Sequence, residues 1–423
     1  MLNGLNRYKS LPVELRTLIA MVGLGSIAGV LYLLADLIKR IVGVDQKMAF
    51  LILLGVGVVL FLIAAGISKL GNLKRRKRSQ RLSEELSGDM GRGPVSMDLR
   101  AVVKANNEKF AAAVRDMKKN AGLNVYDLPW YIIIGDSGCG KTKMVNESGL
   151  TFSLGKPEGY QLGTLNYNWW FTEDAIFIDM AGKLCNPQDD ADYKEWKSFL
   201  DTVGRGRPGY PINGAICCVS ADHLLEDPPE KLEQDANTML ERLRDLQTKL
   251  GVTFATYLVV TKCDKVLGFM QYFDRADRDI TVKNQMVGWS RPGEFNDLYN
   301  PDQFGEDFHQ LYGRLNELRT RRLNDEADEL ELGMAYAFPE QFRELQLPLE
   351  TYIRTLFPPI KNPKAVKNLC FRGIYFTSAT QQGGVILKHL MERLGPEAAE
   401  NFPPLESLYP RPRPMFVKDL MVR

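Results

Sequence analysis

The chain has 423 residues, a length that allows two or three domains. It carries 54 Lys and Arg against 52 Asp and Glu, so its formal net charge of +2 gives no general argument for a nucleic-acid partner, and we expect none. The six cysteines form no Cys-x-x-Cys pair, and the three histidines are far apart in the sequence. This pattern favours reduced thiols over a disulfide framework and argues against a zinc site.

Two uncharged apolar runs, residues 17–35 and 48–67, lie near the N-terminus. Each has about 20 residues, which is enough for a helix to cross the hydrocarbon core of a bilayer. A short loop joins them, so the pattern predicts a two-helix transmembrane hairpin within residues 1–73. The alternative is a signal peptide followed by a buried helix. It is disfavoured because the first run continues into Asp36-Leu37-Ile38-Lys39-Arg40, which is no small-residue cleavage site.

Basic residues flank this predicted hairpin. Arg7, Lys9 and Arg16 precede the first run, and Lys74-Arg75-Arg76-Lys77-Arg78 follows the second. Lys and Arg near the ends of spans mark the cytoplasmic side, so both ends of the hairpin are expected in the cytoplasm. The basic run also favours contact with anionic membrane lipid. Residues 74–120 are interpreted as a basic juxtamembrane linker followed by a helix.

The remaining sequence alternates short apolar runs with helical patterns, which predicts an α/β fold with a mainly parallel sheet covered on both faces. The strand-like runs are residues 131–134, 175–178, 214–219, 256–260 and 374–376. A nucleotide-binding domain is expected over 121–264 and 371–395, a helical insertion over 265–370, and a C-terminal segment over 396–423. In the insertion, apolar residues recur at helical spacing, which favours helices packed on their own domain over a coiled-coil partner helix.

The run Gly135-Asp136-Ser137-Gly138-Cys139-Gly140-Lys141-Thr142 matches the phosphate-binding pattern G-x-x-x-x-G-K-[ST]. Its glycines let the backbone curl so that N–H groups face a phosphate. Lys141 brings positive charge to the β and γ positions, and the Thr142 hydroxyl is placed to bind Mg²⁺. The run follows a strand-like segment and precedes a helical one, as such a loop requires. We therefore predict a P-loop NTPase fold that binds GTP or ATP with Mg²⁺.

The segment Ala175-Ile176-Phe177-Ile178-Asp179-Met180-Ala181-Gly182 carries a second element of this kind. Asp179 ends an apolar strand and can hold Mg²⁺, and Asp-x-x-Gly lets the Gly182 N–H approach a γ-phosphate. Without the preceding P-loop, a strand that ends in a polar turn would be the better explanation of the segment, and the P-loop at this distance reverses that preference. Thr164 is the candidate for a switch threonine that senses γ-phosphate and Mg²⁺.

Hydrolysis by Lys141, Thr164, Asp179 and Gly182 stays an open question at this stage. Lys183 stands where small GTPases often place a water-orienting glutamine. Arg205 and Arg207 are arginine-finger candidates by proximity alone. We expect turnover, if present, to be slow or to require a partner.

Two further elements predict a base pocket. Thr261-Lys262-Cys263-Asp264 matches the [N/T]-K-x-D pattern of GTPases. The Asp264 carboxylate would accept hydrogen bonds from the guanine N1–H and 2-amino groups, a donor pair that adenine lacks, and the Lys262 stem would pack against the base. In Thr377-Ser378-Ala379 the Ala379 N–H can meet the guanine O6. Four motifs in this order predict a GTPase-like site at the carboxyl ends of the strands. GTP is favoured over ATP, and the choice stays open.

The run Trp169-Trp170-Phe171-Thr172-Glu173-Asp174-Ala175, continuing into Asp179-Met180-Ala181-Gly182, resembles the IcmF/TssM family of bacterial type VI secretion. Pro211-Ile212-Asn213-Gly214 is similar to it too. The chain departs from the family pattern at Met180, Leu165 and Asn168, which stand in place of Thr, Arg and Asp. Family members continue into a third transmembrane helix and a periplasmic region, so the resemblance implies that this chain can be a fragment of a longer protein.

The resemblance implies an inner-membrane, multi-pass component of a secretion complex that acts as a scaffold and as an NTP-dependent switch. The implied partners are other inner-membrane and baseplate-side components, with membrane lipid, in an oligomer. Two alternatives stay open. One is a structural tether with no hydrolytic role, and the other is an unrelated membrane-anchored GTPase similar to the signal-recognition-particle receptor.

Overall fold

The structure is a computed structural model, and the chain divides into two compact units, Met1–Lys77 and Arg78–Arg423. It describes Met48 and residues 128–153, 155–156, 166–187, 189–207, 209–274, 286–291, 299–322, 329–358, 369–379 and 414–422. The predicted hairpin, apart from Met48, and the linker over 74–120 lie outside these described residues. Within the described ranges, no helix combines the length and the hydropathy that a membrane span requires.

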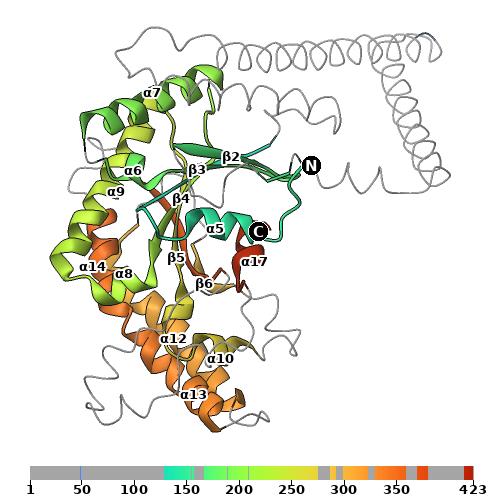
Figure 1. Ribbon diagram of the computed structural model, residues 1–423, viewed down its shortest axis with the longest axis vertical. Helices are drawn as coiled ribbons and strands as arrows, with labels where there is room; N and C mark the ends of the chain where they lie inside the picture. Colours follow the sequence, from blue (N-terminus) through green and yellow to red (C-terminus); the bar gives the residue numbers. More distant parts are fainter. Residues whose placement is uncertain are drawn as a thin grey trace. The chain divides into compact units, whose positions relative to one another are not determined.

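A seven-stranded sheet of order β2-β3-β1-β4-β5-β7-β6 forms the centre of the second unit (Figure 1). Its strands are β1 (Trp130–Gly135), β2 (Tyr167–Phe171), β3 (Ile176–Met180), β4 (Gly214–Ser220), β5 (Ala255–Thr261), β6 (Val287–Ser290) and β7 (Cys370–Phe376). The five inner strands are parallel, and the edge strands β2 and β6 pair antiparallel to their neighbours. Every residue of β3 and β4 is buried, as expected for parallel strands covered on both faces. The predicted α/β class with a mainly parallel sheet is confirmed.

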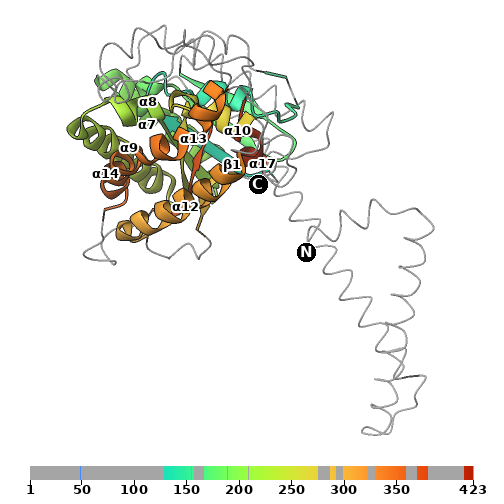
Figure 2. The ribbon, with the colours of Figure 1, turned by 90° about the horizontal axis from the view of Figure 1, so that it is seen from below.

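Helices cover both faces of this sheet (Figures 1 and 2). One core gathers Ile132 and Ile134 of β1 with apolar residues of α6 to α9 and α14, and it extends into α10, α12 and α13. The other gathers Ile133 with residues of α5 and α17. The helices are α5 (Lys141–Asn146), α6 (Gly182–Cys185), α7 (Asp190–Gly206), α8 (Ala221–Glu226), α9 (Pro229–Leu250), α10 (Phe269–Asp274), α12 (Phe304–Arg322), α13 (Glu329–Arg343), α14 (Gln346–Leu356) and α17 (Val417–Val422).

Local sequence explains where the two long helices of the first core begin and end. Asp189 caps α7 by accepting a hydrogen bond from the Asp192 N–H, which satisfies a backbone donor that lacks a partner in the helix. Pro229 occupies the first position of α9, where its missing N–H costs nothing. Gly251 ends α9 with φ 67, a conformation that glycine adopts without strain. These helices flank the strand ends on which the candidate site is built.

The predicted insertion over 265–370 contains helices as expected, and they pack on their own domain. In α12 and α13, Phe308 and Phe342 stack with ring centroids 5.4 Å apart, and Phe342 meets Phe376 of β7 at 4.7 Å. The insertion also contributes the edge strand β6, which the sequence did not reveal. Gly288 within β6 has φ 140 and approaches the Ile374 carbonyl closely, and a glycine in so short a run weakens any strand signal.

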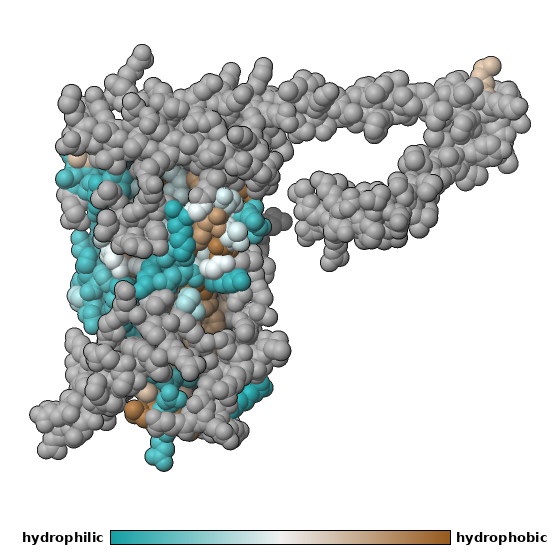
Figure 3. Space-filling view, turned by 45° about the vertical axis from the view of Figure 1, so that its right-hand side comes forward, coloured by the Kyte–Doolittle hydropathy of each residue, from teal (hydrophilic) through white to brown (hydrophobic). Residues whose placement is uncertain are grey.

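The end of the chain belongs to the same domain. Met415 forms a β-bridge with Ser378, and Val417 of α17 is buried in the second core. Residues 414–422 of the predicted C-terminal segment therefore pack on the sheet. Beside α17, residues of the sheet and Leu420 and Met421 line a groove of about 550 Å³. Figure 3 shows apolar residues between hydrophilic ones on the face that it presents.

Candidate nucleotide-binding site

The P-loop follows β1 at the edge where all five parallel strands end. Gly135 has φ 153, and a Cβ atom there would lie 2.4 Å from the Cys218 carbonyl oxygen of β4. Gly140 has φ 89 and caps the start of α5. Any other residue would be strained at either position, so both glycines are required by the backbone path. The strand–loop–helix order that the motif requires is present.

Lys141 is buried and turned into its own loop. Its Nζ donates hydrogen bonds to the carbonyl oxygens of Gly135 and Asp136, each at 2.7 Å. Burial opposes the charged form, but Cys139, Cys185 and the Asp179 carboxylate favour it and raise the pKa of Lys141 overall. The ammonium group therefore stays protonated at the centre of the loop, where a phosphate would need a positive charge.

Thr142 and Asp179 come from different elements and meet beneath the loop. The Thr142 hydroxyl at the start of α5 donates a 2.6 Å hydrogen bond to Oδ2 of Asp179 near the end of β3. Asp179 is fully buried, and the parallel register sets it beside Ile133 of β1. A hydroxyl and a carboxylate are oxygen ligands of the kind that Mg²⁺ takes beside a nucleotide. These side chains fit the predicted metal.

Helix α6 lies directly on the P-loop. A Cβ atom on Gly182 would stand 2.2 Å from the Ser137 amide nitrogen, so the two backbones are in close contact. At the far end of α6, Nδ2 of Asn186 donates to Oδ1 of Asp136 at 3.2 Å. The structure thus brings Gly182 to the phosphate loop, as Asp-x-x-Gly predicts. Thr164 lies outside the described residues.

Arg207 does not lie at this site. Its guanidinium donates to the Leu128 carbonyl and to Oδ1 of Asn213, both at 3.0 Å, and stacks 4.9 Å from the Trp130 ring. These groups are at the amino ends of β1 and β4, opposite the P-loop. The hypothesis that Arg207 is an arginine finger is wrong, because proximity in sequence does not reveal at which edge of the sheet a residue lies. The side chain of Arg205 lies outside the described residues.

The base motifs open onto a cavity of about 390 Å³ beside the P-loop. Gly138 and Gly140 of the P-loop line it together with Thr261, Lys262, Asp264, Thr377 and Ala379 of the base motifs. The sequence did not single out the other lining residues, which are Lys143, Met144, Asp222 and Lys265. Thr261 also hydrogen-bonds through its hydroxyl to the Cys139 carbonyl, which ties β5 to the P-loop. Gly138 and Gly140 of the P-loop and residues of the base motifs therefore line the same cavity.

Asp264 lines the base cavity, and Ser378 is buried beside it. Oγ of Ser378 donates a 2.6 Å hydrogen bond to Oδ1 of Asp264, which fixes the carboxylate. Burial raises the pKa of Asp264, and the hydrogen bond from Ser378 works in the opposite direction. The arrangement can present a fixed acceptor to the N–H groups of a base.

Asp222 is a site residue that the sequence did not reveal. Its Oδ2 atom forms an ion pair with Nζ of Lys262 at 2.8 Å. The backbone of Lys262 is in the left-handed conformation, with φ 54. Burial tends to raise the pKa of Asp222, but the hydrogen bond and the charge of Lys262 oppose it, and the net shift is downward. Asp222 follows β4 immediately after the strand end, and that position was the only available signal.

Comparison with known proteins places this site in a family. The family model for the IcmF-related N-terminal domain matches residues 189–423, more than half of the chain. The chain belongs to the IcmF-related family. A curated relative, the type VI secretion system component TssM1 of Pseudomonas aeruginosa, is 35% identical over 274 residues, which cover 62% of this chain and 24% of the relative. The chain thus spans about a quarter of the length of this curated relative.

Two solved structures are similar to parts of this IcmF-related chain. One is the signal recognition particle receptor SRb-GTP/SRX complex from Chaetomium thermophilum, with 17% identity, TM-score 0.22, and coverage of 32% of this chain and 70% of that chain. The other is the Arl6 BBS3 small GTPase from Trypanosoma brucei with bound GppNp, with 18% identity, TM-score 0.21, and coverage of 54% and 98%. TM-scores this low do not establish a shared fold. Family membership decides against the alternative of an unrelated membrane-anchored GTPase.

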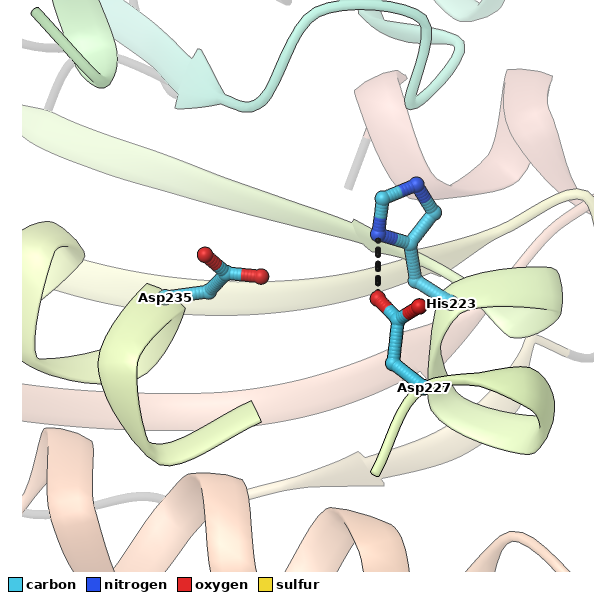
Figure 4. A group of neighbouring side chains, drawn as sticks. All are labelled: His223, Asp227 and Asp235. Atoms are coloured by element: carbon cyan, nitrogen blue, oxygen red, sulfur yellow. Dashed lines mark ion pairs between the residues drawn. The ribbon is translucent and has the colours of Figure 1, made fainter. Parts of the chain in front are cut away.

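A second polar cluster of this IcmF-related chain lies on α8 and α9 (Figure 4). Nδ1 of His223 is 3.1 Å from Oδ2 of Asp227, and the ligand atoms of these residues and Asp235 lie within 4.8 Å of one another. Sequence spacing did not predict this group, because the fold brings Asp235 to the pair. Lys231 Nζ already neutralises Asp235 at 2.6 Å. The Lys231–Asp235 ion pair joins residues four apart on α9, so one acid of the cluster already has a cation.

Proposed function

We propose that this IcmF-related chain is a nucleotide-binding component of a type VI secretion complex, anchored in the bacterial inner membrane with its main domain in the cytoplasm. One observation carries the nucleotide-binding part: two glycines of the P-loop, Gly138 and Gly140, and the [N/T]-K-x-D motif line a single cavity at the carboxyl edge of the sheet. The secretion role is supported by the similarity to TssM1. The hairpin predicted over 1–73 supports the anchoring.

The proposed roles follow from the geometry. Lys141 and the backbone N–H groups of residues 135–142 bind the phosphates, and Thr142 and Asp179 hold Mg²⁺. Bound Mg²⁺ would neutralise part of the phosphate charge. Asp264, fixed by Ser378, accepts from the N1–H and 2-amino groups of guanine, which favours GTP over ATP. Lys262, Thr261 and Ala379 complete the base pocket.

We propose that bound nucleotide acts as a switch for assembly, and that any hydrolysis is slow or partner-dependent. In the described conformation, Lys183 lies beside carboxylates of α7 and is not placed to orient water. The proposed partners are other inner-membrane and baseplate-side components and membrane lipid, in an oligomer without nucleic acid. The second candidate is a structural tether. One observation favours it: the ammonium group of Lys141 already donates hydrogen bonds to two carbonyl oxygens of its own loop.

Nucleotide titration of the purified full chain separates these two functions. Labelled GTP and ATP are titrated with Mg²⁺ against the wild type, Lys141→Ala, and the exposed control Lys194→Ala on α7. We expect micromolar or tighter binding of GTP, weaker binding of ATP, loss of binding in Lys141→Ala, and wild-type binding in Lys194→Ala. If circular dichroism shows a folded chain that binds neither nucleotide, the switch is refuted and the tether becomes the better account.

A further inference from the structure

Lys183 occupies a position next to the phosphate loop although its side chain points elsewhere. It follows Gly182, whose backbone touches Ser137 of the P-loop. A lysine stem of four carbons is flexible enough to direct its ammonium group to different neighbours. In the described conformation, that group lies 3.8 Å from Oδ1 of Asp192 and 3.7 Å from Oε2 of Glu195, both on α7.

These two ion pairs are loose. Charge-assisted N–H to carboxylate hydrogen bonds normally measure about 2.7–2.9 Å, well below the separations at Lys183. The Lys183 side chain is also 42% exposed, and such half-solvated pairs contribute little to stability. The attraction that keeps Lys183 on α7 is therefore weak enough for a stronger anion to replace it.

Glu195 is the unusual member of this group. Only 4% of its surface is exposed, and its Oε1 atom has no hydrogen-bond partner among the described residues. Burial raises the pKa of this carboxyl, and Lys183 is the main group that opposes the shift. A buried carboxylate with one loose partner costs free energy. Its charge state therefore depends on where the ammonium group of Lys183 lies.

We propose that Lys183 is a sensor of the terminal phosphate, which exchanges the carboxylates of α7 for the γ-phosphate of a bound nucleoside triphosphate. This proposal rests on the proposed nucleotide binding and names the residue that distinguishes triphosphate from diphosphate. A diphosphate offers no anion beside Gly182, so Lys183 stays on α7. A triphosphate draws it away and leaves Glu195 without its cation, so that Glu195 takes up a proton or α7 shifts.

The exchange gives α7 a defined part in the switch. Helix α7 covers the side of the sheet next to β2 and β3, and Glu195 also helps to raise the pKa of buried Tyr167 on β2. The presence of the γ-phosphate would therefore change the charge state of Glu195, which does not itself contact the nucleotide. Coupling of this kind is reciprocal, so removal of the Glu195 charge must favour the triphosphate.

Affinities of the full chain for GDP and for a non-hydrolysable GTP analogue, with Mg²⁺, test the proposal. Lys183→Met should weaken triphosphate binding about tenfold and leave diphosphate binding unchanged, whereas Lys183→Arg should retain the preference. Glu195→Gln should tighten triphosphate binding about threefold or more, but only while Lys183 is present. Lys194→Met, beside Glu195 on the exposed side of α7, is the matched control and should change neither affinity.

The outcomes separate this proposal from the function on which it rests. If the wild type binds both nucleotides but Lys183→Met changes both affinities equally or neither, the sensor role is wrong and nucleotide binding stands. The same holds if Glu195→Gln acts equally with and without Lys183. If the folded wild type binds no nucleotide, both proposals fall together.

Discussion

The contact between α6 and the P-loop can be tested by adding one methyl group. In Gly182→Ala, the new Cβ would lie 2.2 Å, 2.3 Å and 2.7 Å from the amide nitrogen, Cα and Cβ of Ser137. Two of these atoms belong to the backbone, so no side-chain rotation relieves the clash. The segments must separate by about 1 Å, and overpacking of this kind typically costs about 1–3 kcal/mol. We expect the free energy of unfolding to fall by that amount.

Gly313→Ala is the matched control for this substitution. Gly313 lies inside α12, and a Cβ atom there would meet nothing within 4 Å. Alanine is the better helix former, so this variant should gain about 0.5–1 kcal/mol. Urea unfolding of the full chain, followed by tryptophan fluorescence, measures both changes. If Gly182→Ala is as stable as the wild type, α6 does not press on the P-loop in solution.

Three further outcomes follow from the contacts. Arg207→Met should lose about 1–3 kcal/mol of stability, because the buried Leu128 carbonyl loses the hydrogen bond that Arg207 donates to it. Its GTP affinity should be unchanged, and an altered affinity would contradict the placement of Arg207 away from the site. Ser378→Ala should weaken GTP binding about tenfold with little effect on ATP, since it releases Asp264; titration that shows equal losses would refute the base assignment. The pKa of Glu195 in the folded chain lies above its ordinary 4.5. Its contribution to the free energy of unfolding is therefore fully present below pH 4.5 and is lost as the pH rises through the pKa of the folded state. In Glu195→Gln this loss of stability between acidic and neutral pH should be absent. Urea unfolding midpoints of both chains at the two pH values measure it.

The predictions that held came from patterns in which neighbouring residues act together. The run 135–142 predicted a strand, a loop and a helix in this order, and the structure has β1, the loop and α5 there. Apolar runs 131–134 and 214–219 are continuous because parallel strands are buried on both faces, and both became strands. Such signals depend on local backbone chemistry, so they can be read without the fold.

The sequence could not show features that depend on long-range packing. Strand β6 is short and carries Gly288, so only its pairing with β7 reveals it. Arg207 is near the motifs along the chain but lies at the opposite edge of the sheet, because α7 runs back along the sheet before β4 begins. Asp222 reaches Lys262 only because β4 and β5 are neighbours in the sheet.

The sequence by itself indicated the motifs of this protein and the family to which they point: a run with the P-loop pattern, an acid at the end of a strand and a motif of the [N/T]-K-x-D type. The tertiary structure alone decided which of these groups face one another. It set Gly182 against Ser137, turned Lys183 towards Glu195 and joined the phosphate and base motifs in one cavity. The physical reason is that residue type fixes what a group can bind, whereas strand order and helix packing fix the distances at which groups act.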